Sequence, residues 1–251
     1  MLIKSRKKEQ EEKGRQMNTI TDKAYNAFKK YFVDGYTQLE RAFMAIVVAV
    51  QVLVYCAMPD TPLSIIAGIA GCISVVMCAK GRLEFYFIGF AQNFSYMWLA
   101  YQNRFYGEVI ENVFYVLTMI WGSFAWSNNM QDGVDDTKDV IAKKFTLRQW
   151  VASIVLTIMA TALMGNWLTS IGSNQAYLDA ATNVMAIFAQ IMMVKRYREQ
   201  WVWWIVIDVI NIIMWAAVGN WSMVAMYIAW TANCIYGWAN WTKLNKVSEY
   251  A

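Results

Sequence analysis

The sequence has no histidine, only two prolines, and a charged fraction of 16% over its 251 residues. Without histidine there is no imidazole for acid–base catalysis, metal binding or haem ligation. The four cysteines form no CxxC pair and lie in apolar stretches, where they are expected to be small buried hydrophobic residues. The motifs GxxxxGK[ST], GxGxxG and GxSxG are also missing. We therefore expect no cofactor, no metal, no nucleic-acid partner and no enzymatic activity.

Long apolar runs are what the chain has in abundance, since 58% of its residues are hydrophobic. A membrane span needs about 20 mainly apolar residues. Eight stretches meet this requirement: 40–58, 62–79, 84–103, 106–127, 148–168, 176–195, 200–218 and 221–242. The N-terminus is too charged, and its first apolar run too late, for a cleavable signal peptide. The sequence predicts an all-α membrane protein with about eight transmembrane helices.

Lysine and arginine predict the orientation of these spans. Nine of the 22 basic residues fall in the first 30 positions, in a charged and partly amphipathic segment expected in the cytoplasm. With this end inside, the internal connections 80–84, 127–146 and 195–199 carry eight basic residues, whereas the outside loops carry only Arg104. Both termini are thus predicted to be cytoplasmic.

An internal repeat appears without a gap at a separation of 115 residues. Identical pairs include Lys80/Lys195, Glu84/Glu199, Val109/Val224, Ile120/Ile235, Gly122/Gly237 and Trp126/Trp241. Spans two to four therefore repeat as spans six to eight. The single span between them keeps both repeats in the same orientation, which is a parallel repeat of the kind found in transporters.

These observations divide the chain into six predicted segments. They are an N-terminal segment (1–35), an extra transmembrane helix (36–60), a first three-helix repeat (61–127), a cytoplasmic loop with a linker helix (128–170), a second three-helix repeat (171–243) and a cytoplasmic tail (244–251). Both prolines belong to the first outside loop, so no span has a proline hinge in its interior. If the repeats move, we expect hinges at glycines such as Gly89, Gly122 and Gly237.

Polar residues occur at membrane depth in both repeats, where they cost free energy unless they face the bundle interior or a water-filled cavity. In the seventh span, Trp204, Asp208, Asn211 and Trp215 share one helix face. The other candidates for a binding site are Asn93, Tyr96, Trp98, Gln102, Asn112, Asn183, Gln190, Tyr227, Trp230 and Asn233. Amides bind hydroxyls and aromatic faces attract a flat cation, so the set suits a neutral-to-cationic, hydroxylated, ring-bearing solute.

Each candidate also has a purely structural interpretation. Amide and hydroxyl side chains can hold membrane helices together. Tryptophans near the ends of spans are commonly interfacial anchors, and we expect this of Trp201, Trp203, Trp221 and Trp241. Asp208, the only acid deep in the second repeat, either favours a cation or pairs with a neighbour.

The second repeat resembles the PnuC family of nicotinamide riboside transporters. The resemblance lies in a basic cluster, then W-x-x-W (Trp201, Trp204), D-x-x-N (Asp208, Asn211) and G-x-x-x-W (Gly237, Trp241). It covers residues 36–245 and is most specific over 178–241. It implies a SWEET-like bundle with two three-helix repeats, a linker helix between them and one extra helix that precedes the first repeat in the sequence. It also implies facilitated diffusion of nicotinamide riboside, a precursor of NAD, and trapping by a cytoplasmic riboside kinase.

The resemblance further implies a homotrimer. The residues themselves leave open a carrier for another vitamin or nucleoside, such as thiamine, and proton coupling through Asp208. A membrane enzyme has less support, because the chain lacks histidine and any paired acid and nucleophile. A structural or sensory membrane protein would not explain buried amides in both repeats.

Overall fold

The computed structural model describes residues 22–249 except 24, 27, 58–60, 105, 134–136, 173–175, 218 and 220. Within these residues, the long helices are α2 (Gln38–Ala57), α3 (Pro62–Lys80), α4 (Phe85–Gln102), α5 (Tyr106–Ser127), α6 (Leu147–Ser170), α7 (Ala176–Val194), α8 (Gln200–Ala217) and α9 (Trp221–Glu249). Each of the eight predicted spans is helical, which confirms the prediction. Most of the predicted segment 1–35 lies outside the described residues.

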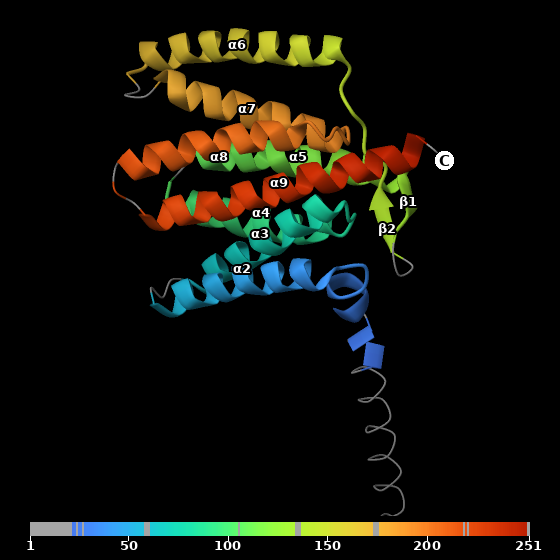
Figure 1. Ribbon diagram of the computed structural model, residues 1–251. Helices are drawn as coiled ribbons and strands as arrows, with labels where there is room; N and C mark the ends of the chain where they lie inside the picture. The colour runs from blue at the N-terminus through green and yellow to red at the C-terminus, as the bar shows by residue number, and fades with distance from the viewer. Residues whose placement is uncertain are drawn as a thin grey trace, which may run out of the picture.

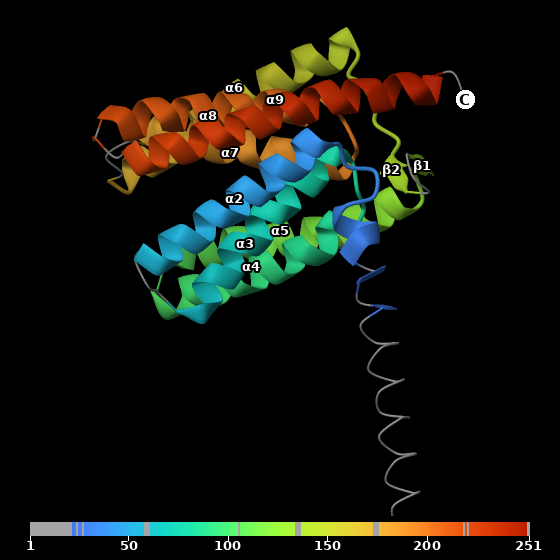
Figure 2. The same ribbon diagram turned by 60° about the horizontal axis from the view of Figure 1, so that its bottom comes forward.

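The helices form two halves of four that lie side by side (Figure 2). One half contains α2 to α5 and the other contains α6 to α9. Helix α2 packs against α3, and α6 packs against α7, at opposite sides of the bundle (Figure 1). The two halves meet where α3 contacts α9 and where α5 contacts α7.

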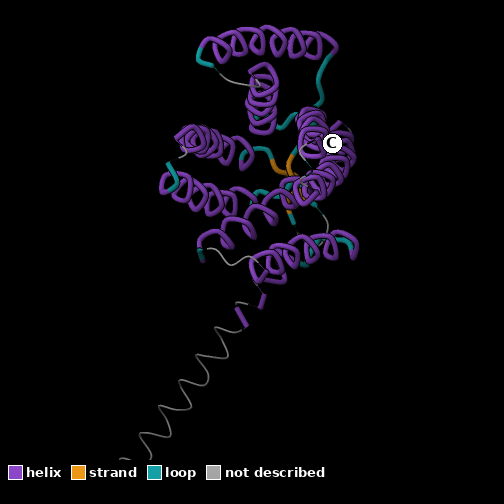
Figure 3. The backbone as a smooth tube through the Cα atoms, turned by 90° about the vertical axis from the view of Figure 1, so that its left-hand side faces the viewer, coloured by secondary structure: helices purple, strands orange, loops and turns teal. Residues whose placement is uncertain are grey.

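A short β-hairpin that the sequence did not predict caps one end of the bundle. Strand β1 (Met130–Asp132) pairs antiparallel with β2 (Lys138–Val140), and the Val140 amide donates to the Gly81 carbonyl at 2.8 Å. The strands lie behind the middle of the bundle in Figure 3, near the end of α9. We call this the hairpin end, and we call the opposite end, where α2–α3, α4–α5, α6–α7 and α8–α9 connect, the turn end (Figure 1).

Five helices among the described residues are long and apolar enough to cross a membrane: α2, α3, α5 from Val109, α6 and α7. Helix α8 has a shorter described apolar run, Gln200–Met214. Helices α4 and α9 contain amides such as Gln92, Asn93 and Asn233. Each helix that falls short carries polar residues inside the bundle, as α5 and α7 also do, in a protein that crosses the membrane several times.

The backbone repeats at the same separation of 115 residues as the sequence. Helix α8 begins and ends 115 positions after α4, and α9 begins 115 positions after α5. Left-handed residues also correspond, because Gly81 (φ 88°) matches Arg196 (φ 68°), and Arg104 (φ 60°) matches Gly219 (φ 74°). Because α3 corresponds to α7 and α5 corresponds to α9, the contact between α3 and α9 is equivalent to the contact between α7 and α5. The fold thus consists of α2, the repeat α3–α5, the linker α6 and the repeat α7–α9.

Two equivalent tryptophans join the repeats near the hairpin end. The Trp126 indole donates to the Met193 carbonyl at 3.0 Å, and the Trp241 indole donates to the Cys78 carbonyl at 3.1 Å. Both tryptophans are 0% exposed, and their ring centroids are 5.3 Å apart. Tyr86 packs edge-on against Trp126, and Trp201 packs edge-on against Trp241. We call these four residues the aromatic floor.

This burial corrects one interpretation of the sequence. Trp201, Trp203 and Trp241 were expected at the membrane interface, but all three are buried in the protein. Trp241 bonds to α3 of the other repeat and Trp201 packs against it, so both rings lie at the junction between the repeats. The side chain of Trp221 lies outside the described part.

The expected hinge glycines occupy close contacts between helices. A β-carbon on Gly237 would lie 2.6 Å from the Trp201 ring, and one on Gly122 would overlap the Tyr86 hydroxyl. Helices α5 and α9 are continuous through these positions. The structure therefore gives Gly122 and Gly237 a role in packing the aromatic floor.

Candidate binding cavity

A cavity of about 680 Å³ lies between the two repeats. Its lining comes from α3, α4, α5, α7, α8 and α9. Among the described residues, ten pairs of lining positions are separated by 115: Val75/Gln190, Cys78/Met193, Phe85/Gln200, Gly89/Trp204, Gln92/Ile207, Asn93/Asp208, Tyr96/Asn211, Asn112/Tyr227, Tyr115/Trp230 and Met119/Cys234. The cavity therefore lies on the axis that relates the repeats.

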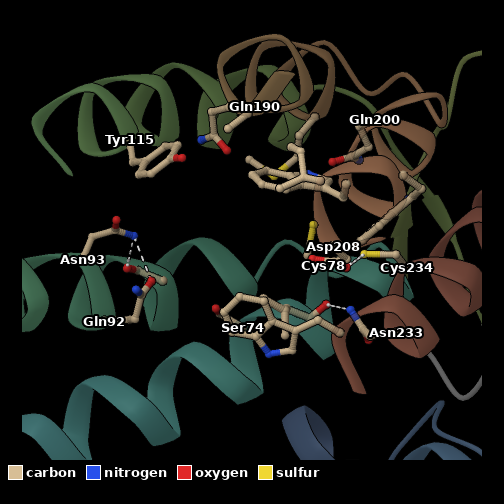
Figure 4. A pocket seen from close by; sticks show the side chains of 18 of the residues that line it. Ser74, Cys78, Gln92, Asn93, Tyr115, Gln190, Gln200, Asp208, Asn233 and Cys234 are labelled. Atoms are coloured by element: carbon tan, nitrogen blue, oxygen red, sulfur yellow. Dashed lines mark hydrogen bonds between the residues drawn. The ribbon is translucent and has the colours of Figure 1, made fainter. Parts of the chain in front are cut away.

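Two amides of the cavity join the repeats at equivalent places. Gln190 of α7 donates to the Thr118 hydroxyl of α5 at 3.0 Å. Asn233 of α9 donates to the Val75 carbonyl of α3 at 3.3 Å (Figure 4). Position 190 is the equivalent of position 75, and position 233 is the equivalent of position 118, at the separation of 115. The two hydrogen bonds therefore join equivalent positions of the two repeats, although different chemical groups form them. The interpretation of amides as links between helices thus holds for Gln190 and Asn233.

Asn93 and Asp208 also form equivalent contacts, in both cases with sulfur. Asn93 donates to the Met119 sulfur at 3.3 Å and to the Gly89 carbonyl at 2.8 Å. The Cys234 thiol donates to the Asp208 carboxylate at 3.7 Å (Figure 4). Asp208 is buried, and none of the ion pairs within the described part of the chain involves it. The second repeat therefore places an acid, without a basic partner, where the first places an amide.

Aromatic side chains supply much of the remaining lining. Tyr227 and Trp230 contact each other edge-on with ring centroids 5.5 Å apart, and Trp204 lies one turn before Asp208 on α8. Tyr115 donates to Glu111 at 2.7 Å. Among the described lining residues there is no lysine or arginine. The cavity offers rings, amides and two acids, a set suited to a flat cation with hydroxyl groups.

The cavity is closed at the hairpin end. Phe85 and Gln200 lie at this end of the lining, next to the aromatic floor. The lining continues toward the turn end as far as Tyr96, Glu111 and Tyr227. Access to the cavity is therefore blocked on the hairpin side by the four buried rings of the aromatic floor.

Eleven of the predicted residues line this cavity: Asn93, Tyr96, Asn112, Asn183, Gln190, Trp204, Asp208, Asn211, Tyr227, Trp230 and Asn233. Trp98 and Gln102 do not line it. Trp98 is 54% exposed and contacts Tyr101, and Gln102 lies one turn further on the same outward face of α4. The side chain of Trp215 lies outside the described part.

Several lining residues were missed from the sequence. Gln200 follows the basic connection 195–199 directly, so it was read as the boundary of a span. Glu111 lies near the outer end of α5, and only its i, i+4 spacing from Tyr115 hinted that it faces inward. Ser74, Cys78 and Met193 belong to apolar faces that carried no polar pattern.

Two parallel three-helix repeats around a central cavity, in a bundle of membrane-spanning helices, define a multi-pass membrane transporter. The family described as nicotinamide mononucleotide transporter matches residues 61–243, and the chain belongs to this family. Its relatives include the nicotinamide riboside transporter PnuC of Haemophilus influenzae, 36% identical over 219 residues, which span 87% of this chain and 96% of the relative.

Two further comparisons agree with this assignment. The nicotinamide riboside transporter PnuC of Neisseria mucosa is 33% identical over 227 residues, covering 87% of this chain and 86% of the relative. The crystal structure of a vitamin B3 transporter PnuC matches with a TM-score of 0.74 and 32% identity, over 87% of this chain and 97% of that chain. The SWEET-like arrangement expected from the resemblance is consistent with this match.

Proposed function

We propose that the chain carries nicotinamide riboside across a bacterial cytoplasmic membrane by facilitated diffusion. The observation that carries this proposal is the cavity on the repeat axis, which combines aromatic rings, amides and one buried acid without a basic partner. A pyridinium ring bears a positive charge and a flat face, which suit Trp204, Trp230 and Asp208. The ribose hydroxyls suit the amides Asn112, Asn183 and Asn211.

The lining favours the riboside over its mononucleotide. The family description names the mononucleotide, whereas the relatives from Haemophilus and Neisseria are named riboside transporters. A phosphate buried without a cation or a bidentate clamp is strongly unfavourable. No lysine or arginine belongs to the described lining, and Glu111 would repel a phosphate. The phosphorylated product would then be retained in the cytoplasm, which is how a riboside kinase traps its substrate.

The distribution of charge supports a cytoplasmic hairpin end. Basic residues gather there, with Lys80 and Arg82 after α3, Lys138 in the hairpin, and Lys195 to Arg198 after α7. Both described ends of the chain lie on this side (Figure 1). The cavity would then face outward, with the aromatic floor closing the cytoplasmic side. Alternating access would require the Trp126–Met193 and Trp241–Cys78 hydrogen bonds to open.

We expect passive transport because the described lining holds no histidine and no second acid at the position equivalent to Asp208. Proton-coupled carriers commonly use an intramembrane acid or histidine relay. This chain has no histidine, and the counterpart of Asp208 in the first repeat is Asn93, which does not titrate. The homotrimer implied by the family resemblance stays a prediction, as does the link to a kinase.

Liposomes that contain the purified protein test the proposal directly. Riboside uptake should stop at equal inside and outside concentrations when the membrane potential is clamped to zero, with or without a pH gradient. The clamp is needed because a potential alone favours a cation by about 2.3 kcal/mol per 100 mV. Accumulation that a pH gradient drives and that Asp208→Asn abolishes would show proton coupling instead. If the liposomes took up thiamine and not the riboside, thiamine would be the substrate instead.

A further inference from the structure

Gln200 is a buried amide whose hydrogen-bonding groups are not used. It is the first residue of α8, it is 0% exposed, and it lines the end of the cavity nearest the aromatic floor. Neither its Oε1 nor its Nε2 has a hydrogen-bond partner among the described residues. Figure 4 shows the side chain directed toward the space between the other labelled residues.

Such an arrangement is costly in the empty protein. A buried donor or acceptor without a partner costs about 1–3 kcal/mol. Gln190, Asn233 and Asn93 each donate to a protein acceptor, and although the Asn233 Oδ1 is also unpartnered, Gln200 alone of these amides has neither group bonded. A buried polar group left in this way in a binding cavity indicates a partner that arrives with the ligand.

The missing partner must both accept and donate, in one plane. A primary carboxamide has a carbonyl oxygen and an NH₂ group in this arrangement, and it pairs with a second carboxamide through two parallel hydrogen bonds. A single hydroxyl satisfies at most one of these interactions well at a time. Building on the proposed function, we propose that Gln200 reads the carboxamide of nicotinamide riboside and determines specificity for it.

The register of α8 fixes the orientation of the bound riboside. Gln200, Trp204 and Asp208 are spaced by four residues, so successive side chains lie about 6 Å apart along one face of the helix. With its carboxamide at Gln200, the pyridinium ring stacks on Trp204 and its charged nitrogen points toward Asp208. The ribose then lies toward the turn end, near Asn211. Because Gln200 is 0% exposed, the proposal requires this end of the cavity to open slightly for the carboxamide.

The test compares two cationic ribosides by calorimetry on the purified full-length protein. In 3-acetylpyridine riboside, a methyl group replaces the carboxamide NH₂, while the ring, the charge and the carbonyl are kept. The parent should bind nicotinamide riboside about 5- to 150-fold more tightly than this analogue, because the analogue leaves the Gln200 oxygen without a partner. Gln200→Leu should bind the two ribosides about equally, mainly because its binding of nicotinamide riboside is weaker.

Two further variants keep the test decisive. Gln102→Leu makes the same chemical change at an exposed glutamine outside the lining, and it should retain the preference between the two ribosides. Gln200→Met, which keeps the length of the side chain, replaces Gln200→Leu if the latter does not fold. Equal binding of both ribosides by the parent, or an unchanged preference in the Gln200 variants, overturns the inference alone. Failure of the parent to bind nicotinamide riboside overturns both the proposed function and this inference.

Discussion

In the first repeat, the indole of Trp126 binds the backbone of α7, and in the second repeat the indole of Trp241 binds the backbone of α3. The glycines that make room for the aromatic floor, Gly122 and Gly237, are also equivalent. The two tryptophans and the two glycines of this end are thus identical in both repeats and make equivalent contacts. Equal contacts on both sides of the axis would allow the two halves to separate and close as similar units.

The cavity shows the opposite relation between the repeats. None of the ten equivalent pairs that line it is identical, and the pairs Phe85/Gln200, Gly89/Trp204 and Asn93/Asp208 differ in chemistry. A ligand with a flat cationic ring at one end and a ribose at the other has no two-fold symmetry. The comparison teaches that the repeats keep their symmetry where they pack and lose it where they face the solute.

The largest expected effect concerns the equivalent tryptophans. Trp126→Ala and Trp241→Ala should each destabilise the protein by roughly 3–5 kcal/mol, because each removes a fully buried ring and its hydrogen bond. The two losses should be similar, as measured by thermal unfolding in detergent. Trp98→Ala, which truncates an exposed tryptophan, serves as the control and should change stability little. A large loss for only one of the two would break the equivalence of the repeats.

Substitution of the equivalent glycines should cause a smaller loss of stability, and the two positions should differ in one respect. Gly122→Ala and Gly237→Ala each force a methyl group into a packed ring, at a cost of about 1–3 kcal/mol. The nearest atom to the new methyl at position 122 is the Tyr86 hydroxyl oxygen, whereas at position 237 it is a Trp201 ring carbon. Tyr86→Phe should therefore partly restore Gly122→Ala and leave the defect of Gly237→Ala. If Tyr86→Phe restored the stability of Gly122→Ala and Gly237→Ala equally, this packing would be contradicted.

The asymmetry of the cavity is tested by binding. Trp204→Ala and Asn211→Ala should weaken nicotinamide riboside binding by roughly 1–3 kcal/mol, or about 5- to 150-fold, through loss of a stacked ring or a hydrogen bond. Gln102→Ala is the matched amide control, since Gln102 is exposed and lies outside the lining. Calorimetry on the purified variants measures all three. If Gln102→Ala weakened binding as much as Asn211→Ala, the cavity would not be the binding site.

Periodic features of the sequence predicted most of the fold. Apolar length predicted the eight helices, and identities such as Glu84/Glu199 and Trp126/Trp241 predicted the repeat without a gap. The hairpin was not predicted, because strands of three residues with polar sequences carry no alternating pattern. Its position depends on a contact far along the chain, between Val140 and Gly81.

Polar residues that stood out against an apolar helix, such as Asp208 and Asn211, line the cavity. Trp98 and Gln102 do not, because the phase of α4 turns them to its outward face. The role of the lining residues in binding stays a prediction. The burial of Trp201 and Trp241 was not foreseen because their positions near helix ends are also typical of interfacial anchors. Only packing between the repeats distinguishes the two roles.

The smallest expected effect concerns charge at the two equivalent corners of the hairpin end. In the first repeat, the Val140 amide binds the Gly81 carbonyl, beside Asp139 and Arg82; in the second, the Lys143 amide binds the Arg196 carbonyl. Burial raises the pKa of the Asp139 carboxyl, and Arg82 and Lys80 oppose this shift only in part. Burial together with Arg196 and Lys195 lowers the pKa of the Lys143 ammonium. The two corners therefore respond to pH with opposite signs.

For Asp139, the folded state binds the proton more tightly than the unfolded state does. The stability contribution of this group therefore falls as the pH rises from the unfolded pKa near 4 through the raised folded value. Unfolding temperatures can be measured in detergent from about pH 4 to pH 8. As the pH falls, the unfolding temperature of the parent should rise relative to that of Asp139→Asn. For Lys143, whose folded pKa is lowered, stability is lost as the pH falls from the unfolded pKa near 10.4 through the folded value, so the parent should become less stable relative to Lys143→Gln as the pH falls from about 11 toward neutrality. If the parent instead lost stability relative to Asp139→Asn at low pH, its ion pair with Arg82, at 3.8 Å, would outweigh the cost of burial and the corners would respond alike.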